Sequence, residues 1–241
     1  MRSAAEVLAL ETIAYGCWRA PEVEELDGWR LRFAHGLTGR ANSVWPYGGG
    51  AVPLDEKIAC AEDWYRSRSL PAMFQITAAV NPPELDAVLA ERGYRLRGEP
   101  VAVCTADLGE VVGRTPDSAE VGELDGAWLR LWAGVRRFER HDVLRALLTA
   151  GVCAFARVAG VAVGRGVVVG DWLGVTSMAT LPEARRRGHA RAILGALARW
   201  GAARGCTRAL LQVERGNLAA EALYAGAGFV PHHDYHYRLL E

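Results

Sequence analysis

The sequence lacks the cysteine pattern of a disulfide framework or a zinc site. Its 241 residues include five cysteines, an odd number, and no two of them form a Cys-x-x-Cys pair. They lie far apart in the chain, at Cys17, Cys60, Cys104, Cys153 and Cys206. Dispersed cysteines of this kind are typical of proteins from a reducing compartment. We therefore expect neither structural disulfides nor a bound metal.

The sequence also lacks net charge and long hydrophobic runs. The 28 lysines and arginines balance 28 aspartates and glutamates, so bulk attraction to nucleic acid or to an anionic membrane is not expected. No apolar run approaches the roughly 20 residues that a membrane-spanning helix needs. Glu6 and Glu11 interrupt the N-terminal stretch that could otherwise serve as a secretory leader. The expectation is a cytoplasmic globular protein with neither nucleic acid nor membrane as a partner.

The most informative stretch of the chain runs from residue 172 to residue 200. A run of mostly apolar and β-branched residues over 175–181 predicts a strand that ends at Pro182. A basic turn over 185–190 follows. The apolar residues beyond it recur at helical spacing: Ala190, Ile193, Leu194, Leu197 and Gly201. The sequence therefore predicts a strand that leads through a turn directly into a helix.

The turn that opens this helix has the features of an anion-binding site. The first main-chain N–H groups of a helix have no acceptor inside it and lie at the positive end of its dipole, where pyrophosphate is a common occupant. Gly188 allows a phosphate to approach the backbone closely, and Ala190 is too small to obstruct it. Taken alone, the three arginines 185–187 are equally compatible with a solvated helix start or a nucleic-acid patch.

The residues before the turn predict an antiparallel meander. Three strands are expected over 152–158, 161–169 and 172–180, and the connections between them are too short for anything but hairpins. Two helices are expected before them, over 125–136 and 141–150. Antiparallel strands argue against a dinucleotide-binding fold, of whose glycine pattern only Gly188-x-Ala190 is present.

Two motifs together resemble the GNAT family of N-acetyltransferases. Arg185-x-x-Gly188-x-Ala190 after a strand is similar to the Arg/Gln-x-x-Gly-x-Gly/Ala loop that binds acyl-CoA in that family. After the strand 211–213, the residues of a second GNAT signature follow, although Ala222 here directly precedes the Leu-Tyr pair: Asn217, Ala222, Leu223, Tyr224, Gly228 and Phe229. The resemblance implies an α/β fold with a mixed sheet (α+β) and acetyl-CoA as co-substrate. It covers the C-terminal half well and the N-terminal half only faintly.

The first half of the chain contains a weaker echo of the second. Phe74-Gln75-Ile76, an Asn-Pro-Pro helix start and Arg92-Gly93-Tyr94 repeat the order of strand, polar loop, helix and Gly-aromatic pair. Leu89 falls opposite Tyr224, and the basic glycine turn is missing, so we expect a tandem in which the first half is GNAT-like but degenerate. The polar segment 107–120 predicts a linker, which divides the chain into domains 1–112 and 113–241. The other elements expected in the first half are a helix over 3–15, strands over 29–33 and 41–47, and a helix over 54–68.

The resemblance also assigns roles to residues of both motifs. It implies that main-chain groups near Met178 and Thr180 pair with the pantetheine arm and that the Met178 N–H polarises the thioester carbonyl. Tyr224 matches the tyrosine that protonates the departing sulfur, since a phenol with an ordinary pKa of about 10 can donate to the thiolate of a thiol with a pKa of about 8.5. The catalytic pair is thus Tyr224 and Met178. The cofactor-binding set is Met178, Ala179, Thr180, Arg185, Arg186, Arg187, Gly188, His189, Ala190, Arg191, Asn217 and Tyr224.

The general base is left open by the sequence. The strand glutamate of some histone-modifying relatives corresponds to about Gly174 here. Asp171, Glu214 and a relay through water are the alternatives.

The acceptor site is equally open. The run from His232 to His236 is expected to line the acceptor pocket rather than to bind a metal, and alternation places His236 and Arg238 on one face of a strand and Tyr235 and Tyr237 on the other. Three first-half residues either reach the acceptor site or belong to the surface or core: Arg40, Trp45 and Tyr47.

The expected function is direct transfer of an acetyl group from acetyl-CoA to an amine. Small amines, antibiotics, peptide N-termini and protein lysines all fit as acceptors, and a homodimer is compatible with the sequence. Because the strand acid is missing, a non-catalytic acyl-CoA-binding regulatory module is the alternative.

Overall fold

The computed structural model describes residues 2–136 and 140–240. The first half of the chain forms α1 (Ala4–Cys17), β1 (Glu22–Leu26), β2 (Trp29–Phe33), a 3₁₀ turn (Gly39–Ala41), β3 (Val44–Trp45), α2 (Leu54–Arg66), β4 (Met73–Ile76), α3 (Leu85–Glu91), β5 (Arg95–Leu96), β6 (Val101–Asp107) and α4 (Leu108–Arg114). The second half forms β7 (Glu120–Gly122), α5 (Gly126–Arg136), α6 (His141–Leu148), β8 (Val152–Val158), β9 (Ala162–Val169), β10 (Trp172–Thr180), a 3₁₀ turn (Pro182–Ala184), α7 (His189–Ala202), β11 (Arg208–Glu214), α8 (Leu218–Gly226) and β12 (Val230–Leu239).

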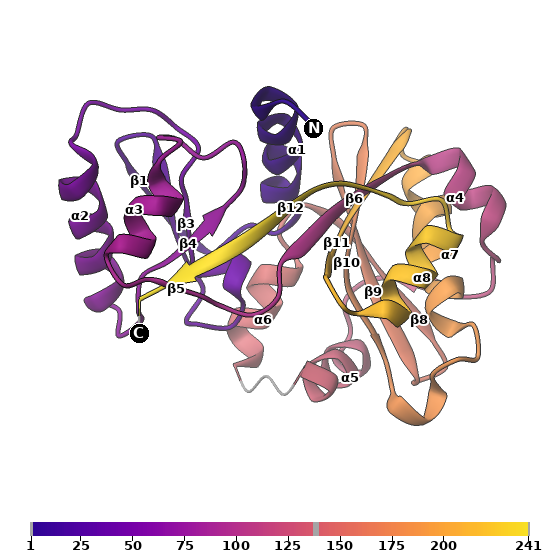
Figure 1. Ribbon diagram of the computed structural model, residues 1–241. Helices are drawn as coiled ribbons and strands as arrows, with labels where there is room; N and C mark the ends of the chain where they lie inside the picture. The colour runs from indigo at the N-terminus through magenta and orange to yellow at the C-terminus, as the bar shows by residue number, and fades with distance from the viewer. Residues whose placement is uncertain (1, 137–139, 241) are drawn as a thin grey trace.

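Over the described residues, twelve strands form one continuous mixed sheet. Its order is β1-β2-β3-β4-β12-β6-β11-β10-β9-β8-β7, and β5 pairs with β12 beside this path. Of the neighbouring strands, β3 and β4 run parallel, as do β10 and β11, and the other pairs are antiparallel. The sheet extends through two lobes, with β12 running from one lobe to the other (Figure 1). The predicted mixed α/β sheet and the meander β8-β9-β10 are confirmed.

The two lobes exchange strands. In the first lobe, the unit β4-α3-β5 receives the end of β12 between its two strands, because His236–Leu239 pairs with β4 and residues 238–239 also pair with β5. In the second lobe, the unit β11-α8-β12 receives β6 in the same place, between β11 and the start of β12. Both units therefore have the predicted order of strand, helix and strand, and each is completed by a strand from the other half.

The predicted linker over 107–120 is wrong. Residues up to Asp107 belong to β6, and 108–114 form α4, whose buried Leu108 and Val111 join the core of the second lobe. The Asp107 side chain accepts a hydrogen bond from the Glu110 N–H at 3.0 Å and so caps this helix. Glycines and charges suggested a loop here, but the cap and the apolar spacing favour a helix. The expected boundary between 112 and 113 falls inside it.

The first lobe also differs from expectation in its strands. The predicted strand over 41–47 is reduced to Val44–Trp45, since the Asn42 side chain accepts from the main chain of Ala34 and Gly36 and holds the preceding residues in a turn. Strand β1 was not predicted, because four of its five residues are exposed and Glu-Val-Glu-Glu carries no apolar alternation.

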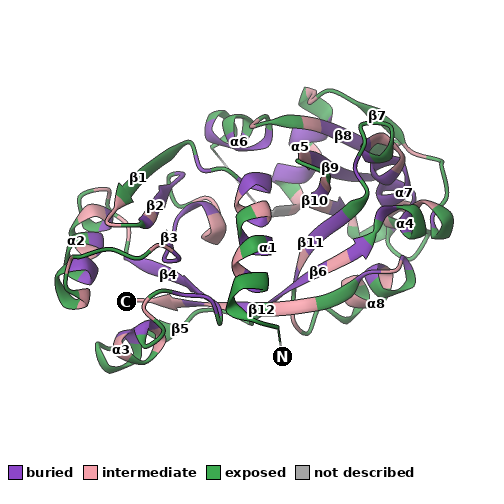
Figure 2. Ribbon diagram, turned by 90° about the horizontal axis from the view of Figure 1, so that it is seen from above, coloured by how far each residue is buried: buried purple, intermediate pink, exposed green. Residues whose placement is uncertain are grey.

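Helix α1 lies between the two lobes (Figure 2). Its buried Leu10, Ala14 and Cys17 pack in one cluster with residues of β4, β6, β9, β11 and β12. Helices α5 and α6 cover the same face of the second-lobe sheet as α1. Helices α7 and α8 pack on the opposite face, where Leu211 and Val175 point. Within the described ranges, no helix has the length and apolarity to cross a membrane.

Asp86 on α3 forms hydrogen bonds with two residues of β12. The Asp86 carboxylate accepts from Arg238 at 2.7 Å and lies 3.0 Å from the His236 ring. This confirms that His236 and Arg238 share a face, as Tyr235 and Tyr237 share the other, in the core. Burial opposes ionisation of Asp86, but the two hydrogen bonds outweigh it and lower the pKa of this carboxyl below its ordinary value.

Asp86→Asn is expected to reduce the free energy of unfolding at neutral pH by about 0.2–1 kcal/mol, since the carboxylate is 39% exposed. A lowered folded-state pKa means that this contribution is present above the unfolded-state pKa of about 3.9 and is lost as the pH falls through the folded value. Urea unfolding of both proteins at neutral pH and near pH 3 measures it. A difference that stays constant across this range contradicts the assignment.

Candidate active site

Strands β10 and β11 run side by side and then part. Trp172–Val175 pairs with Arg208–Leu211, and the ladder ends at that point. Beyond it, β10 continues to Thr180 and β11 to Glu214 without pairing to each other. The sheet therefore opens between two parallel strands, which leaves main-chain groups on both inner edges free to bind an extended ligand.

A bulge in β10 lies at this opening. The register between β10 and β9 shifts between Thr176 and Ala179, and Ser177 has a positive φ of 55°. A bulge leaves main-chain groups of the extra residue outside the ladder. The Met178 side chain packs near Gly164 and Ile193 on the α7 face. The predicted thioester-polarising residue thus lies where β10 is irregular and has separated from β11.

The predicted anion site is a left-handed turn followed by a helix N-terminus. Arg186 has a φ of 62°, and Gly188, the N-cap of α7, has a φ of 82°. Residues 185–188 are all exposed. Among the described hydrogen bonds, none uses a main-chain N–H from Arg186 to Arg191, so these groups and the positive end of the fourteen-residue helix face solvent.

Arg191 and Asn217 have partners within the protein. The Arg191 guanidinium donates to the Arg114 carbonyl at the end of α4. The Asn217 side chain accepts from the Ala220 N–H at 3.2 Å and is the N-cap of α8. Both residues therefore help to hold helices next to the parted strands, and this structural role is separate from their predicted role in cofactor binding.

Tyr224 lies on α8, on the helix-covered face of the opening. It is 9% exposed, and its ring meets Phe229 edge-on with centroids 6.0 Å apart. Tyr224 belongs to the same hydrophobic cluster as Val175 and Leu211, where the strands part, and Met178 packs against that cluster. The structure thus brings the predicted catalytic pair to one region.

Helix α1 fills the space beside Gly174, the position that corresponds to the strand glutamate of some histone-modifying relatives. A Cβ added to Gly174 would collide with Cys17 Sγ, so this site has no room for a glutamate. Asp171 is also unsuitable as a base, because it precedes β10 and lies seven residues from Met178, about 23 Å along an extended strand. Hydrogen bonds from Arg208 lower the pKa of Asp171, and Thr207 adds another at 3.2 Å. Glu214 is exposed and lies three residues past the last paired position of β11, as Met178 does on β10.

A pocket on the other face of the opening contains residues that the sequence did not identify. It lies between the lobes, and Gln212, one residue past the last paired position of β11, forms part of its wall. Other side chains that line it are Glu11, Trp18, Arg32, Arg40 and Gln75. Of the three first-half residues considered from the sequence, Arg40 and Trp45 line this pocket, whereas Tyr47 belongs to the core. For two of the others the echo was a usable signal, because Gln75 and Gln212 occupy the same place in the two repeated strands.

The histidines of β12 divide between two places. His233 Nε2 lies 2.8 Å from Glu11 in the pocket wall, and His232 Nδ1 lies 2.8 Å from His233 Nδ1. His236 instead contacts Asp86 in the first lobe. Of the run that is expected to line the acceptor pocket, His236 therefore lies away from the pocket between the lobes, because β12 crosses into the first lobe there.

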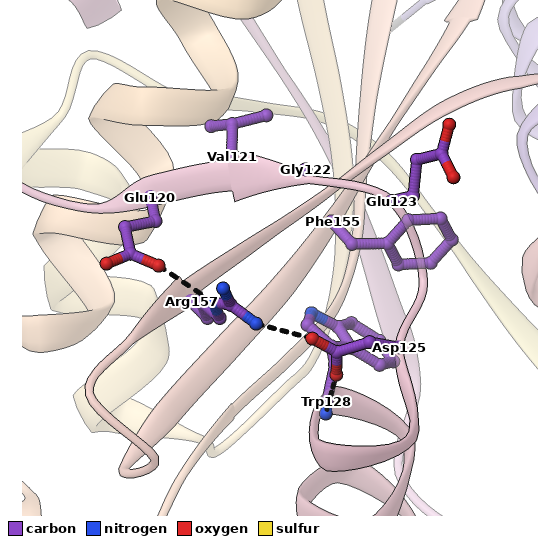
Figure 3. A pocket seen from close by; sticks show the side chains of 8 residues that line it. All are labelled: Glu120, Val121, Gly122, Glu123, Asp125, Trp128, Phe155 and Arg157. Atoms are coloured by element: carbon purple, nitrogen blue, oxygen red, sulfur yellow. Dashed lines mark hydrogen bonds and ion pairs between the residues drawn. The ribbon is translucent and has the colours of Figure 1, made fainter.

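A larger cavity lies at the edge of the sheet beside β7 (Figure 3). Its carboxylates Glu120 and Asp125 both accept from Arg157, and Asp125 also caps α5 by accepting from the Trp128 N–H at 2.7 Å. In the order of the sheet, β9 and β8 separate β7 from β10. This cavity is distant from the parted strands and contains no predicted site residue.

The chain is similar to known acetyltransferases over almost its whole length. Residues 4–238 match the family described as probable histone acetyltransferase Rv0428c C-terminal. The chain is 33% identical over 246 residues to the probable histone acetyltransferase Rv0428c of Mycobacterium tuberculosis, with 97% of this chain and 74% of that protein covered. It is 29% identical over 250 residues to the uncharacterized N-acetyltransferase YobR of Bacillus subtilis, with 97% and 98% covered. A GCN5-related N-acetyltransferase from Kribbella flavida has the same fold, with a TM-score of 0.66 at 16% identity over 99% of this chain and 96% of that one. The chain therefore belongs to the Rv0428c C-terminal family of GNAT N-acetyltransferases and is an acyltransferase.

Proposed function

We propose that the protein transfers an acetyl group from acetyl-CoA directly to an amine. The observation that carries this proposal is the continuity of one segment, in which the parted strand β10, its bulge and the basic turn before α7 follow each other without interruption. An extended pantetheine arm fits between parted strands, and its pyrophosphate fits the free N–H groups of the turn. The GNAT family generally uses acetyl-CoA, which agrees with this assignment.

In this proposal the chain's own groups supply three functions. The turn 185–191 binds the pyrophosphate through main-chain N–H groups and arginine side chains. The Met178 N–H donates to the carbonyl oxygen as negative charge develops there, an interaction worth roughly 3 kcal/mol. The neutral amine nitrogen forms its bond to the carbonyl carbon, the carbon–sulfur bond breaks, and the Tyr224 hydroxyl gives its proton to the departing thiolate. The nitrogen releases its extra proton to water, and the Tyr224 phenolate regains a proton from water. No covalent intermediate with the protein is needed.

We further propose that the first half is a degenerate GNAT-like half in a tandem arrangement. The matching units β4-α3-β5 and β11-α8-β12 support this proposal, as does the buried Leu89 in the place of Tyr224. The division into 1–112 and 113–241 is better moved to the start of α4, since that helix packs on α7 in the second lobe.

Tyr224→Phe is expected to lower kcat at least about 100-fold, the usual range for losing a general acid, while the affinity for acetyl-CoA stays within about twofold. Thiol release with a panel of amines measures kcat, and calorimetric titration measures the affinity. Tyr94→Phe is the matched control, because Tyr94 is buried and donates to Glu62 at 3.0 Å in the first lobe. If Tyr224→Phe has no effect on any rate, the role of Tyr224 is refuted. If the wild type binds acetyl-CoA and never releases thiol, the protein is the regulatory module considered from the sequence.

A further inference from the structure

Ser177 combines two unfavourable features in one residue at the opening between β10 and β11. Its φ is 55°, in the left-handed region that residues other than glycine rarely adopt. Its hydroxyl oxygen is buried, and within the part of the chain that the structure describes it has no hydrogen-bond partner. Backbone strain and an unpaired buried hydroxyl each lower stability, and both are typical of functional sites. The two features together therefore indicate a functional role for Ser177.

The position of Ser177 in the sheet accounts for its strain. Between the two paired positions that flank the bulge, β9 has a single residue, Gly164, whereas β10 has Ser177 and Met178. The Met178 side chain takes the space that Gly164 leaves open, since a Cβ added to Gly164 would lie 2.5 Å from the Met178 sulfur. Ser177 is therefore the extra residue of the bulge. Its backbone conformation orients the next peptide group, which carries the Met178 N–H.

This position adjoins the predicted acyl site. Ser177 lies two residues past Val175, the last residue of β10 that pairs with β11, and it directly precedes Met178. The residues on both sides have their contacts inside the protein. The Thr176 hydroxyl accepts from Arg165 at 3.2 Å, and the Met178 side chain packs against the hydrophobic cluster on the α7 face. The Ser177 hydroxyl is thus the group at the bulge that is available to a ligand.

The Ser177 hydroxyl is suited to donate a hydrogen bond and not to attack the thioester. A serine nucleophile needs a base within hydrogen-bond reach to take its proton, and none of the described groups forms a hydrogen bond with Ser177 Oγ. A donor needs only its own O–H, whose direction adjusts to the acceptor. Ser177 as a whole is partly exposed, and no hydrogen bond opposes rotation about its Cα–Cβ bond. Its hydroxyl is therefore free to turn toward a ligand.

We propose that the Ser177 hydroxyl is a second donor to the carbonyl oxygen of acetyl-CoA, beside the Met178 N–H. Binding of the thioester gives the unpaired hydroxyl an acceptor. The hydrogen bond then strengthens as the amine adds to the carbonyl carbon and negative charge develops on the oxygen. The hydroxyl keeps its proton throughout and forms no bond to the acetyl group. This inference rests on the proposed acetyl transfer and adds a catalytic residue to it.

Infrared difference spectroscopy of bound acetyl-CoA, isotopically labelled at the thioester carbonyl, tests this donor without an acceptor amine. A hydrogen bond to the carbonyl oxygen weakens the double bond and lowers its stretching frequency. Ser177→Ala is therefore expected to shift the labelled band to a higher frequency than in the wild type. For any amine that the wild type acetylates, kcat is expected to fall about 100-fold, as for the loss of one oxyanion donor, while the affinity for acetyl-CoA stays within about threefold.

Two further variants separate the hydroxyl from the backbone strain. Ser69→Ala is the matched control, because Ser69 has a φ of 57° but is an exposed residue just after α2 in the first lobe. It is expected to leave both the carbonyl band and kcat unchanged. Ser177→Gly removes the hydroxyl and also the strain, since glycine adopts a positive φ readily. It is expected to shift the band and lower kcat as Ser177→Ala does.

The stability of the ligand-free protein is an additional measurement. Removing a buried hydroxyl that has no partner also removes the penalty for burying it. The urea midpoint of Ser177→Ala is therefore expected to equal or exceed that of the wild type. A lower midpoint would show that the hydroxyl holds the bulge in place, which contradicts the proposed role.

The outcomes separate this inference from the proposed acetyl transfer. If acetyl-CoA binds and both Ser177 variants leave the carbonyl band or kcat as in the wild type, the hydroxyl is not a donor, and the proposed transfer stands without it. If mass spectrometry finds an acetyl group on Ser177 that passes to the amine, Ser177 is a nucleophile and the inference is wrong. If acetyl-CoA does not bind to the folded wild type, the proposed acetyl transfer fails first, and this inference fails with it.

Discussion

Replacing Gly188 by glutamate is expected to weaken acetyl-CoA binding at least about 100-fold. The substitution adds a carboxylate at the N-cap of α7, where free N–H groups and the helix dipole favour an anion, and so repels the pyrophosphate. An L-residue at a φ of 82° also carries a strain of roughly 1–2 kcal/mol. That strain is local, because a Cβ added at Gly188 meets no atom within 4 Å.

Gly205→Glu isolates the effect of the charge at the turn. Gly205 also has a φ of 82°, its Cβ position is equally open, and it lies beyond the opposite end of the same helix. Both variants therefore share the backbone strain and the added carboxylate. Calorimetric titration with acetyl-CoA is expected to show near wild-type affinity for Gly205→Glu and none measurable for Gly188→Glu. Equal affinities of the two variants would remove the turn from the cofactor site.

The second lobe could be predicted well because its signals are local. The hairpins of β8, β9 and β10 follow from turns of three and two residues, and the start of α7 follows from Gly188 and the apolar spacing after it. The strand exchange could not be predicted in this way. Whether β6 lies beside β4 or beside β11 depends on contacts between residues about a hundred positions apart, and no local pattern distinguishes these pairings. The linker predicted over α4 failed for a different reason, because glycines and charges in this segment obscured the Asp107 cap and the apolar spacing of the helix.

The site residues also divide into those with local sequence signals and those that only long-range packing brings together. The turn 185–190, Met178 and Tyr224 belong to contiguous motifs, and the sequence identified them as candidates. The pocket beside them is made of Glu11 from α1, Arg40 from the first lobe and Gln212 from the second. These residues are distant in sequence and become neighbours only through the packing of α1 between the lobes. A single sequence contains no spacing rule for such a set.

A buried arginine shows how this packing is stabilised. Arg165 on β9 has no solvent exposure and donates to the Leu148 carbonyl at 2.6 Å, the Cys17 carbonyl at 2.8 Å and the Ala150 carbonyl at 3.0 Å. Cys17 ends α1, and Leu148 ends α6. The guanidinium therefore donates to carbonyls at the C-terminal ends of two helices. Its positive charge lies at the negative ends of their dipoles, where a cation is stabilising. It joins the first helix of the chain to the sheet of the second lobe.

Arg165→Met is accordingly expected to lower the free energy of unfolding by about 3–5 kcal/mol, since it leaves buried carbonyls without donors while nearly preserving volume. Arg157→Met on the adjacent strand is the control. Arg157 is 46% exposed and pairs with Glu120 and Asp125 at the surface, so a small fraction of that loss is expected. Urea unfolding followed by tryptophan fluorescence measures both. Similar stabilities of the two variants would show that apolar packing alone holds α1 in place, and the pocket would then not depend on this arginine.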